Sequence, residues 1–194
     1  MVNSFGFGQT DTPPPSFSDR LLGHPAQLRR SYWDWESVLN SNRDGFFPYT
    51  PASNLLFGLR EAADMLLEEG LDAVFDRHAR LAGAVRAAVE GWNLEILCAE
   101  PDSRSNTLTA VTMPQGNDAD KLRQLILRRF NISLGKGLGK LTGKVFRIGH
   151  LGDLNEPMLM GTLCGIEMGL AEAGVPFRHG GIAAAMTQLQ TAGS

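Results

Sequence analysis

Two amphipathic helical patterns follow one another with a single glycine between them, and this limits the possible folds more than any other feature. Apolar residues recur at three- and four-residue steps from Ala52 to Glu69, the period of a helix with one apolar face. Gly70 is suited to end that helix, and a second pattern runs from Leu71 to Trp92. Because the connection is so short, the two helices should be neighbours in space.

Beyond Gly91 the apolar period shortens to that of β-strands. Residues 94–98 and 107–113 alternate or run apolar with β-branched side chains. A further strand is predicted at 145–149, after a glycine-rich loop at 135–143.

Two more helices are predicted from their start signals. Asn117 or Asp118 can cap a helix through about Phe130, and Asn155 can cap one through about Ala173. The last helix carries small residues every four positions that would allow close approach to the sheet: Gly161, Gly165 and Gly169. The order of elements predicts an α+β fold with helices packed on a small, mainly antiparallel sheet.

Residues 1–30 differ in composition from the rest, with a polyproline-type stretch at 12–16 and no apolar period. We expect a disordered or adventitious lead segment at 1–30 and one domain over 31–194. Three aromatic residues open this domain ahead of a loop and should pack against another surface: Tyr32, Trp33 and Trp35.

Composition excludes several classes of partner. A net charge of −3, from 18 basic and 21 acidic residues, gives no electrostatic reason to expect nucleic acid. No apolar run reaches the ~18–20 residues that a membrane span needs. Cys98 and Cys164 form no CxxC pair, and the histidines show no metal-ligand spacing. The sequence predicts a cytoplasmic protein without metal, nucleic-acid or membrane partners.

Arg147 and the loop before it are candidates for ligand binding. Strand alternation puts Phe146 and Ile148 on one face and Arg147 on the other, where it could hold a carboxylate bidentately. A solvated surface arginine is the alternative, and the pattern alone favours it. The loop at 135–143 matches neither a P-loop nor a dinucleotide fingerprint. It could be a flexible connector with solvated lysines or a backbone that approaches a ligand closely.

Two stretches carry a family resemblance. FFPYTPASNLLFGLRE at 46–61 and GLGKLTGKVFRIGHLGD at 137–153 resemble the C-terminal half of class V pyridoxal-phosphate aminotransferases, closest to members that act on serine and glyoxylate. The resemblance covers the chain from about residue 30 to its end. It implies the small C-terminal domain of fold-type I enzymes, a homodimer, and amino-group transfer from serine or alanine to glyoxylate through pyridoxal 5'-phosphate.

The resemblance also implies roles for individual residues. Arg147 matches the arginine that binds the α-carboxylate of the amino-acid and 2-oxo-acid substrates. Thr50 matches a residue that reaches the cofactor phosphate of the neighbouring subunit. Tyr49 stands beside it as a second cofactor-binding candidate, although related alanine enzymes place their phosphate-binding tyrosine where this chain has Phe47.

Family members also have a large domain with the aldimine lysine, and no part of this sequence resembles it. None of the lysines here matches the cofactor lysine: Lys121, Lys136, Lys140 and Lys144. The resemblance therefore implies a fragment, an enzyme by family, with no catalytic lysine and no activity alone. The alternative is a non-catalytic α+β dimerisation or binding module derived from the same fold.

Overall fold

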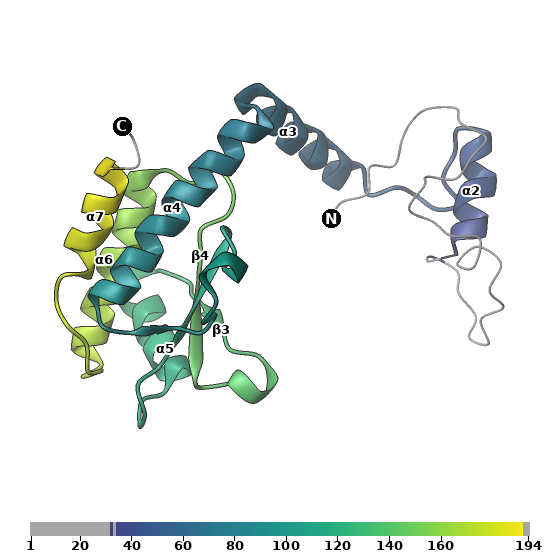
Figure 1. Ribbon diagram of the computed structural model, residues 1–194. Helices are drawn as coiled ribbons and strands as arrows, with labels where there is room; N and C mark the ends of the chain where they lie inside the picture. The colour runs from purple at the N-terminus through teal and green to yellow at the C-terminus, as the bar shows by residue number, and fades with distance from the viewer. Residues whose placement is uncertain (1–31, 33, 192–194) are drawn as a thin grey trace. The chain divides into compact units, whose positions relative to one another are not determined.

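The computed structural model describes residue 32 and residues 34–191 (Figure 1). The chain divides into two compact units, residues 1–64 and 65–194, and each is described by itself. The predicted lead segment at 1–30 lies outside the described residues, as does Trp33, and the single domain over 31–194 stays a prediction.

The first unit contains helix α2 (Trp35–Arg43) and the first part of α3 (Ser53–Glu69). The sequence predicted an aromatic cluster and a loop where α2 forms. Glu36 in the first turn and Arg43 in the last turn complement the helix dipole. The predicted helix at 52–69 is confirmed as α3, and none of its residues is buried.

Helix α4 (Leu71–Gly91) follows directly, and Gly70 between the helices has a φ of +84°, which glycine adopts without strain. One face of α4 packs on α7 (Gly181–Thr191) and on the sheet. Helix α7 was not predicted, because its alanine-rich sequence gives a weak apolar period. Gly181 brings it close to α4, since a Cβ there would overlap the Trp92 ring.

Within the described residues, four strands form one antiparallel sheet in the order β1-β2-β4-β3 (Figure 1). They are β1 (Glu95–Ile96), β2 (Leu108–Thr112), β3 (Gly135–Lys136) and β4 (Val145–Gly149). Two short 3-10 turns, Pro101–Ser103 and Gly139–Leu141, lie in the loops. The predicted antiparallel α+β architecture is therefore confirmed, with β3 as an edge strand inside the glycine-rich segment.

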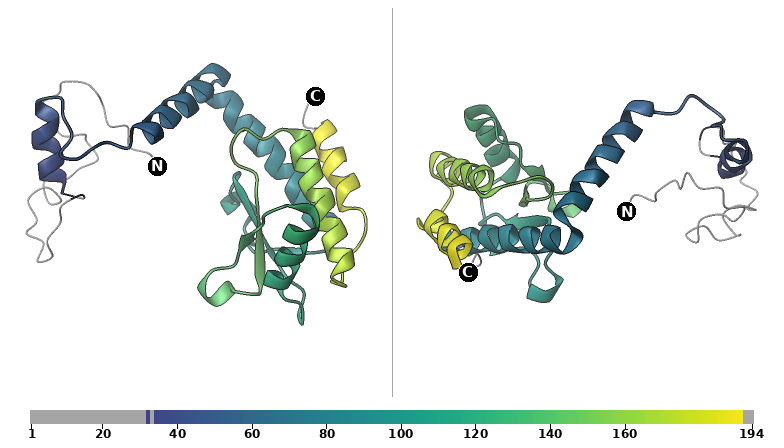
Figure 2. Two further views of the ribbon diagram at one scale, coloured as in Figure 1. Left: turned by 180° about the vertical axis from the view of Figure 1, so that it is seen from behind. Right: turned by 90° about the horizontal axis from the view of Figure 1, so that it is seen from above.

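Helices α5 (Ala119–Phe130) and α6 (Glu156–Glu172) begin at side-chain caps. The Asp118 carboxylate accepts from the Asp120 amide at 2.8 Å, and the Asn155 side chain accepts from the Met158 amide at 3.0 Å. Helices α4 and α5 contact the strands, and helices α4 to α7 gather on one side of the sheet (Figure 2). A single core lies between these layers.

The glycines of α6 allow close packing against α5 and the segment after it, and not against the sheet as predicted. A Cβ at Gly169 would overlap Ile126, and one at Gly165 would overlap Ile132, whereas Gly161 faces open space. Helix α6 lies beside α5 in the helical layer, so its small residues accommodate that neighbour.

Candidate carboxylate-binding site

Arg147 lies on the face of β4 opposite to Phe146 and Ile148, as strand alternation predicted. Phe146 and Ile148 are fully buried in the core, whereas Arg147 is half-buried. Its register partners are Ala110 on β2 and Gly135 on β3. Because both neighbours are small, they leave room beside the guanidinium on this face of the sheet.

The Arg147 guanidinium has no hydrogen bond or ion pair within the described residues, and its buried Nε lacks a partner. Other arginines of the unit differ: Arg77, Arg104 and Arg123 each bind both a carbonyl and a carboxylate. Arg86 also has an unpartnered Nε, but its Nη2 donates to two oxygens. An unsatisfied buried donor costs about 1–3 kcal/mol. Because no described residue pairs with the terminal nitrogens of Arg147 either, these are available to an anion, and a carboxylate suits paired donors.

The glycine-rich segment after β3 forms hydrogen bonds of its own, and both interpretations of it, as a connector or as a backbone that approaches a ligand, stay predictions. The Gly137 amide donates to the Val145 carbonyl at 3.0 Å, and the Thr142 hydroxyl donates to the Gly139 carbonyl at 2.9 Å. The lysines of this segment are exposed, as predicted: Lys136, Lys140 and Lys144. The segment thereby fixes the position of β3 beside Arg147.

Thr50 and Tyr49 belong to the other unit, in the loop between α2 and α3. Both side chains are exposed, and the Tyr49 ring lies 5.7 Å from the Tyr32 ring, measured between centroids. Phe47, at the alternative tyrosine position, is half-buried. The cofactor roles of these residues stay predictions.

Pyridoxal phosphate provides a test of what the described residues could hold. The exposed Thr50 hydroxyl, three residues before α3, could donate to a phosphate oxygen. A lysine held in a pocket is not found in the described part of the chain, where the lysines all face solvent: Lys121, Lys136, Lys140 and Lys144. Among the described residues, Thr50 thus offers one hydroxyl for the phosphate end of the cofactor, and the exposed lysines offer no held amine for its other end.

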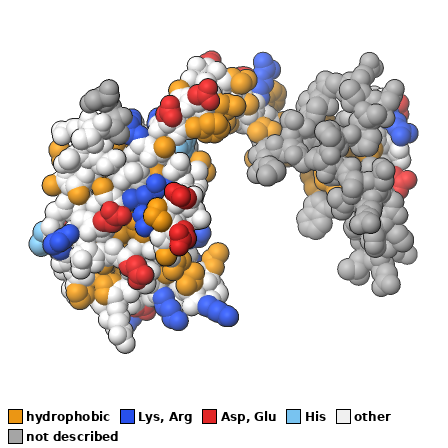
Figure 3. Space-filling model, viewed as in Figure 1, with side chains coloured by type: hydrophobic (Ala, Val, Ile, Leu, Met, Phe, Trp, Pro, Cys, Tyr) orange, Lys and Arg blue, Asp and Glu red, His pale blue; other side chains and the backbone are white. Residues whose placement is uncertain are grey.

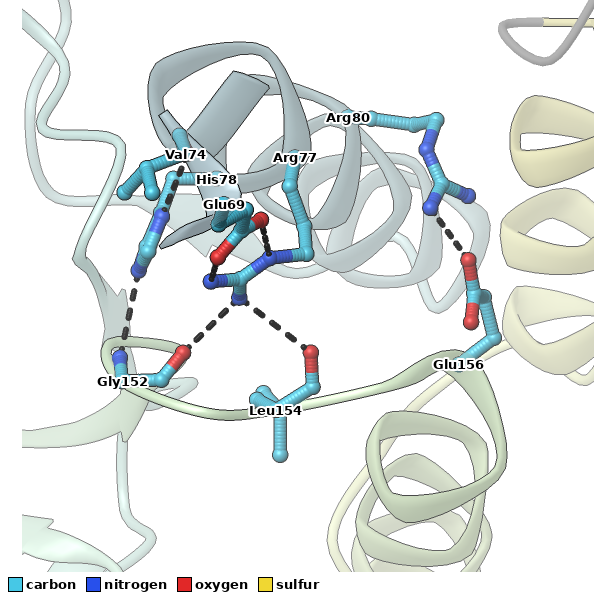
Figure 4. Close-up of polar contacts among 8 residues, drawn as sticks. All are labelled: Glu69, Val74, Arg77, His78, Arg80, Gly152, Leu154 and Glu156. Carbon is cyan, nitrogen blue, oxygen red and sulfur yellow. Dashed lines mark hydrogen bonds and ion pairs between the residues drawn. The ribbon is translucent and has the colours of Figure 1, made fainter. Parts of the chain in front are cut away.

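The loop after β4 is fixed to α4 by a polar network (Figure 4). Arg77 pairs with the Glu69 carboxylate through Nε at 2.6 Å and Nη2 at 2.8 Å, and its Nη1 donates to the Gly152 carbonyl at 2.8 Å. The Gly152 amide donates to Nε2 of buried His78 at 3.1 Å, and Nδ1 contacts the Val74 carbonyl. The hydrogen bond from Arg77 lowers the pKa of Glu69. His78 is therefore a buried, hydrogen-bonded residue.

His150 opens the same loop and is fully buried, which sequence reasoning missed. Its Nδ1 lies 3.0 Å from the Asn106 carbonyl, and its Nε2 lies 3.0 Å from the Thr109 hydroxyl. Burial lowers the pKa of His150 to about 4. The ring is therefore neutral at pH 7, donates from Nδ1 and accepts at Nε2.

Further along, an ion pair between Arg80 on α4 and Glu156 at the start of α6 joins these helices. Hydrogen bonding to its own backbone amide and to Arg80 lowers the pKa of Glu156.

The described residues include no group of three or more His, Cys, Asp or Glu side chains placed to bind a metal ion. None of the described helices is long and apolar enough to cross a membrane.

Comparison with known proteins gives consistent relatives. The chain is 47% identical to a serine–glyoxylate aminotransferase of Methylorubrum extorquens over 169 residues, which are 87% of this chain and 42% of that protein. It is 47% identical to a protein of the same name from Arabidopsis thaliana, covering 82% of this chain and 40% of the relative. The chain thus spans about two fifths of the length of these relatives. No family model matches it.

Solved structures agree on the fold. Pyridoxamine-pyruvate aminotransferase from Mesorhizobium loti superposes with a TM-score of 0.72 at 36% identity, covering 77% of this chain and 38% of that one. Ureidoglycine-glyoxylate aminotransferase from Bacillus subtilis gives a TM-score of 0.76 at 27% identity, covering 82% of this chain and 42% of that one. Both matches confirm the predicted architecture.

Proposed function

The chain belongs to the class V aminotransferases, as the counterpart of the C-terminal part of a member, and on this premise we propose that it binds substrate carboxylates in transamination. Relatives are named for serine and glyoxylate, for L-aspartate and glyoxylate, and for pyridoxamine and pyruvate. Glyoxylate and pyruvate are both short 2-oxo acids, whereas the amino donors differ. The proposed reaction moves an amino group from serine or alanine to glyoxylate.

The unpartnered guanidinium of Arg147 is the observation that carries this proposal. Every substrate of the proposed reaction has a carboxylate next to the reacting carbon, and a guanidinium presents two parallel donors to such a group. Arg147 is half-buried between Ala110 and Gly135, so a small anion can reach it without displacing a side-chain partner. In this role Arg147 orients the substrate and takes no part in proton transfer.

Pyridoxal 5'-phosphate is the proposed cofactor of the complete enzyme, in which it would supply an electron sink for the amino-group transfer. We assign Thr50 to its phosphate as a hydroxyl donor. Tyr49 is a second candidate there, and Phe47 marks the alternative position for such a contact. The described residues provide no positioned amine, so the proposed activity requires a lysine from elsewhere.

Association with a large domain or a second copy is also part of the proposal. Exposed apolar side chains at the end of α3 and the start of α4 support it: Met65, Leu67, Leu71 and Phe75. Apolar side chains on α3 are visible in Figure 3. Contiguous exposed apolar surface favours association.

The free thiols Cys98 and Cys164 support a reducing compartment such as the cytoplasm.

A non-catalytic dimerisation or binding module, the alternative from sequence, is not favoured. The relatives from Methylorubrum extorquens and Arabidopsis thaliana match most of this chain and are named as aminotransferases. An available arginine beside two small residues is also not what a purely structural sheet requires.

The proposal is tested by adding glyoxylate to the ¹⁵N-labelled chain and following, by NMR, the backbone amide resonances of β4 and, where present, the Arg147 side-chain resonances. Arg147→Lys should weaken binding about tenfold or more, because lysine is a point charge without the guanidinium fork. Lys136→Ala and Lys140→Ala serve as matched controls and should change binding little. Equal affinity of Arg147→Ala and the unmodified chain would reject the carboxylate role.

A further inference from the structure

Gly135 is a glycine for reasons of space and not of backbone conformation. It is absent from the glycines that adopt a positive φ, so an L-residue could follow the same backbone. A Cβ placed there, however, would lie 3.0 Å from both Cβ and Nε of Arg147 and 3.5 Å from its Cζ. The Arg147 side chain therefore lies directly over the position that a side chain at 135 would occupy.

This contact explains which edge of the guanidinium is covered. A carboxylate can bind a guanidinium side-on, through Nε and Nη2, or end-on, through Nη1 and Nη2. The Nε atom of Arg147 is buried and has no partner among the described residues, so a ligand cannot reach the side-on edge. Ala110, the register partner of Arg147 on the other flank, is also a small residue.

We propose that Gly135 is a positioning residue: by lacking a side chain it lets the Arg147 guanidinium lie against β3, so that Nη1 and Nη2 receive a carboxylate end-on. The inference rests on the proposed function, since it specifies the geometry of that same site. It also gives β3 a role, because the hydrogen-bonded loop that follows holds Gly135 beside Arg147.

The first test needs no ligand and uses the full chain. In the unmodified protein, the Arg147 Nε proton should exchange with solvent about tenfold more slowly than that of exposed Arg128, because it is buried. Nuclear Overhauser contacts should join the Gly135 α-protons to the Arg147 side chain. Gly135→Ala should remove these contacts and speed the exchange.

The matched control is Gly149→Ala, on the same face of β4, where an added Cβ meets nothing within 4 Å. It should leave the Arg147 signals unchanged. Fast Nε exchange in the unmodified chain, or an unchanged Arg147 in Gly135→Ala, would overturn the proposal. The first of these results needs no variant and stands even if Gly135→Ala fails to fold.

A glyoxylate titration separates this inference from the proposed function. Gly135→Ala should weaken binding about tenfold in the unmodified background. With Arg147→Met already present it should have no further effect, because glycine acts only through the arginine. If Arg147→Met leaves binding intact, the proposed function fails. If Arg147→Met abolishes binding and Gly135→Ala does not change it, the carboxylate role stands and the positioning role is wrong.

Discussion

Replacing His150 by asparagine should remove a defined part of the pH dependence of stability. The imidazole is fully buried between the Asn106 carbonyl and the Thr109 hydroxyl. Asparagine can keep a donor near the Nδ1 position but cannot take up a proton in this range. The variant will be less stable at every pH because it leaves a cavity, so the diagnostic quantity is the slope of stability with pH.

The sign and size of this pH dependence follow from the pKa of His150 in the unfolded and the folded chain. In the unfolded chain a histidine has a pKa of about 6.5, whereas burial lowers the pKa of folded His150 to about 4. Between these values the unfolded state binds more protons, so stability is full above pH 6.5 and is lost as the pH falls toward 4. Linkage gives a loss of about 2 kcal/mol on going from pH 8 to pH 5.

Urea unfolding at pH 8 and pH 5 measures this difference. The unmodified chain should lose about 2 kcal/mol more than His150→Asn over this interval. Protonation of carboxylates whose pKa is lowered, such as Glu69 and Glu156, reduces the free energy of unfolding at still lower pH. This reduction is the same in both proteins. Identical slopes for the two proteins would show that His150 is not buried as a neutral ring.

Two further predictions concern the cofactor and association. The first uses a protein made of these 194 residues, which is mixed with pyridoxal phosphate and then reduced with borohydride. No lysine should carry a stoichiometric label, because the lysines face solvent. Mass spectrometry that finds Lys136 or Lys140 fully labelled would contradict this prediction. The same protein should self-associate in sedimentation velocity at micromolar concentration, and Leu67→Glu with Phe75→Glu should reduce this more than the control Leu127→Glu on α5. A clean monomer before any substitution would exclude that surface as a self-association site.

Periodicity predicted the elements whose apolar residues face a single core. Helices α4, α5 and α6 and strands β2 and β4 follow their patterns, because each buries one regular face. The same argument placed Arg147 opposite to Phe146 and Ile148. It overestimated burial at Leu71 and Phe75, which lie on the apolar side of α4 but are exposed at its start. An apolar stripe indicates a contact surface without saying what covers it.

The features that sequence reasoning missed depend on contacts between distant residues. Strand β3 has only two residues and exists through pairing with β4. His150 is buried because its ring meets Thr109, 41 positions earlier in the chain. Arg77 reaches the Gly152 carbonyl across 75 positions. No local pattern of residue types encodes such pairings, which arise only when the sheet and α4 pack together.

The proposed carboxylate recognition by Arg147 depends on one unit of the chain, and this decides what experiments on that unit can show. Every described residue that shapes the Arg147 environment, including Ala110, Gly135 and the strand residues beneath it, lies in the unit of residues 65–194. The buried core of that unit supports these strands directly. The proposed anion-binding geometry of Arg147 therefore requires no contribution from a cofactor lysine. Loss of glyoxylate binding in Arg147→Lys, with the fold retained, would isolate recognition from catalysis within this single unit.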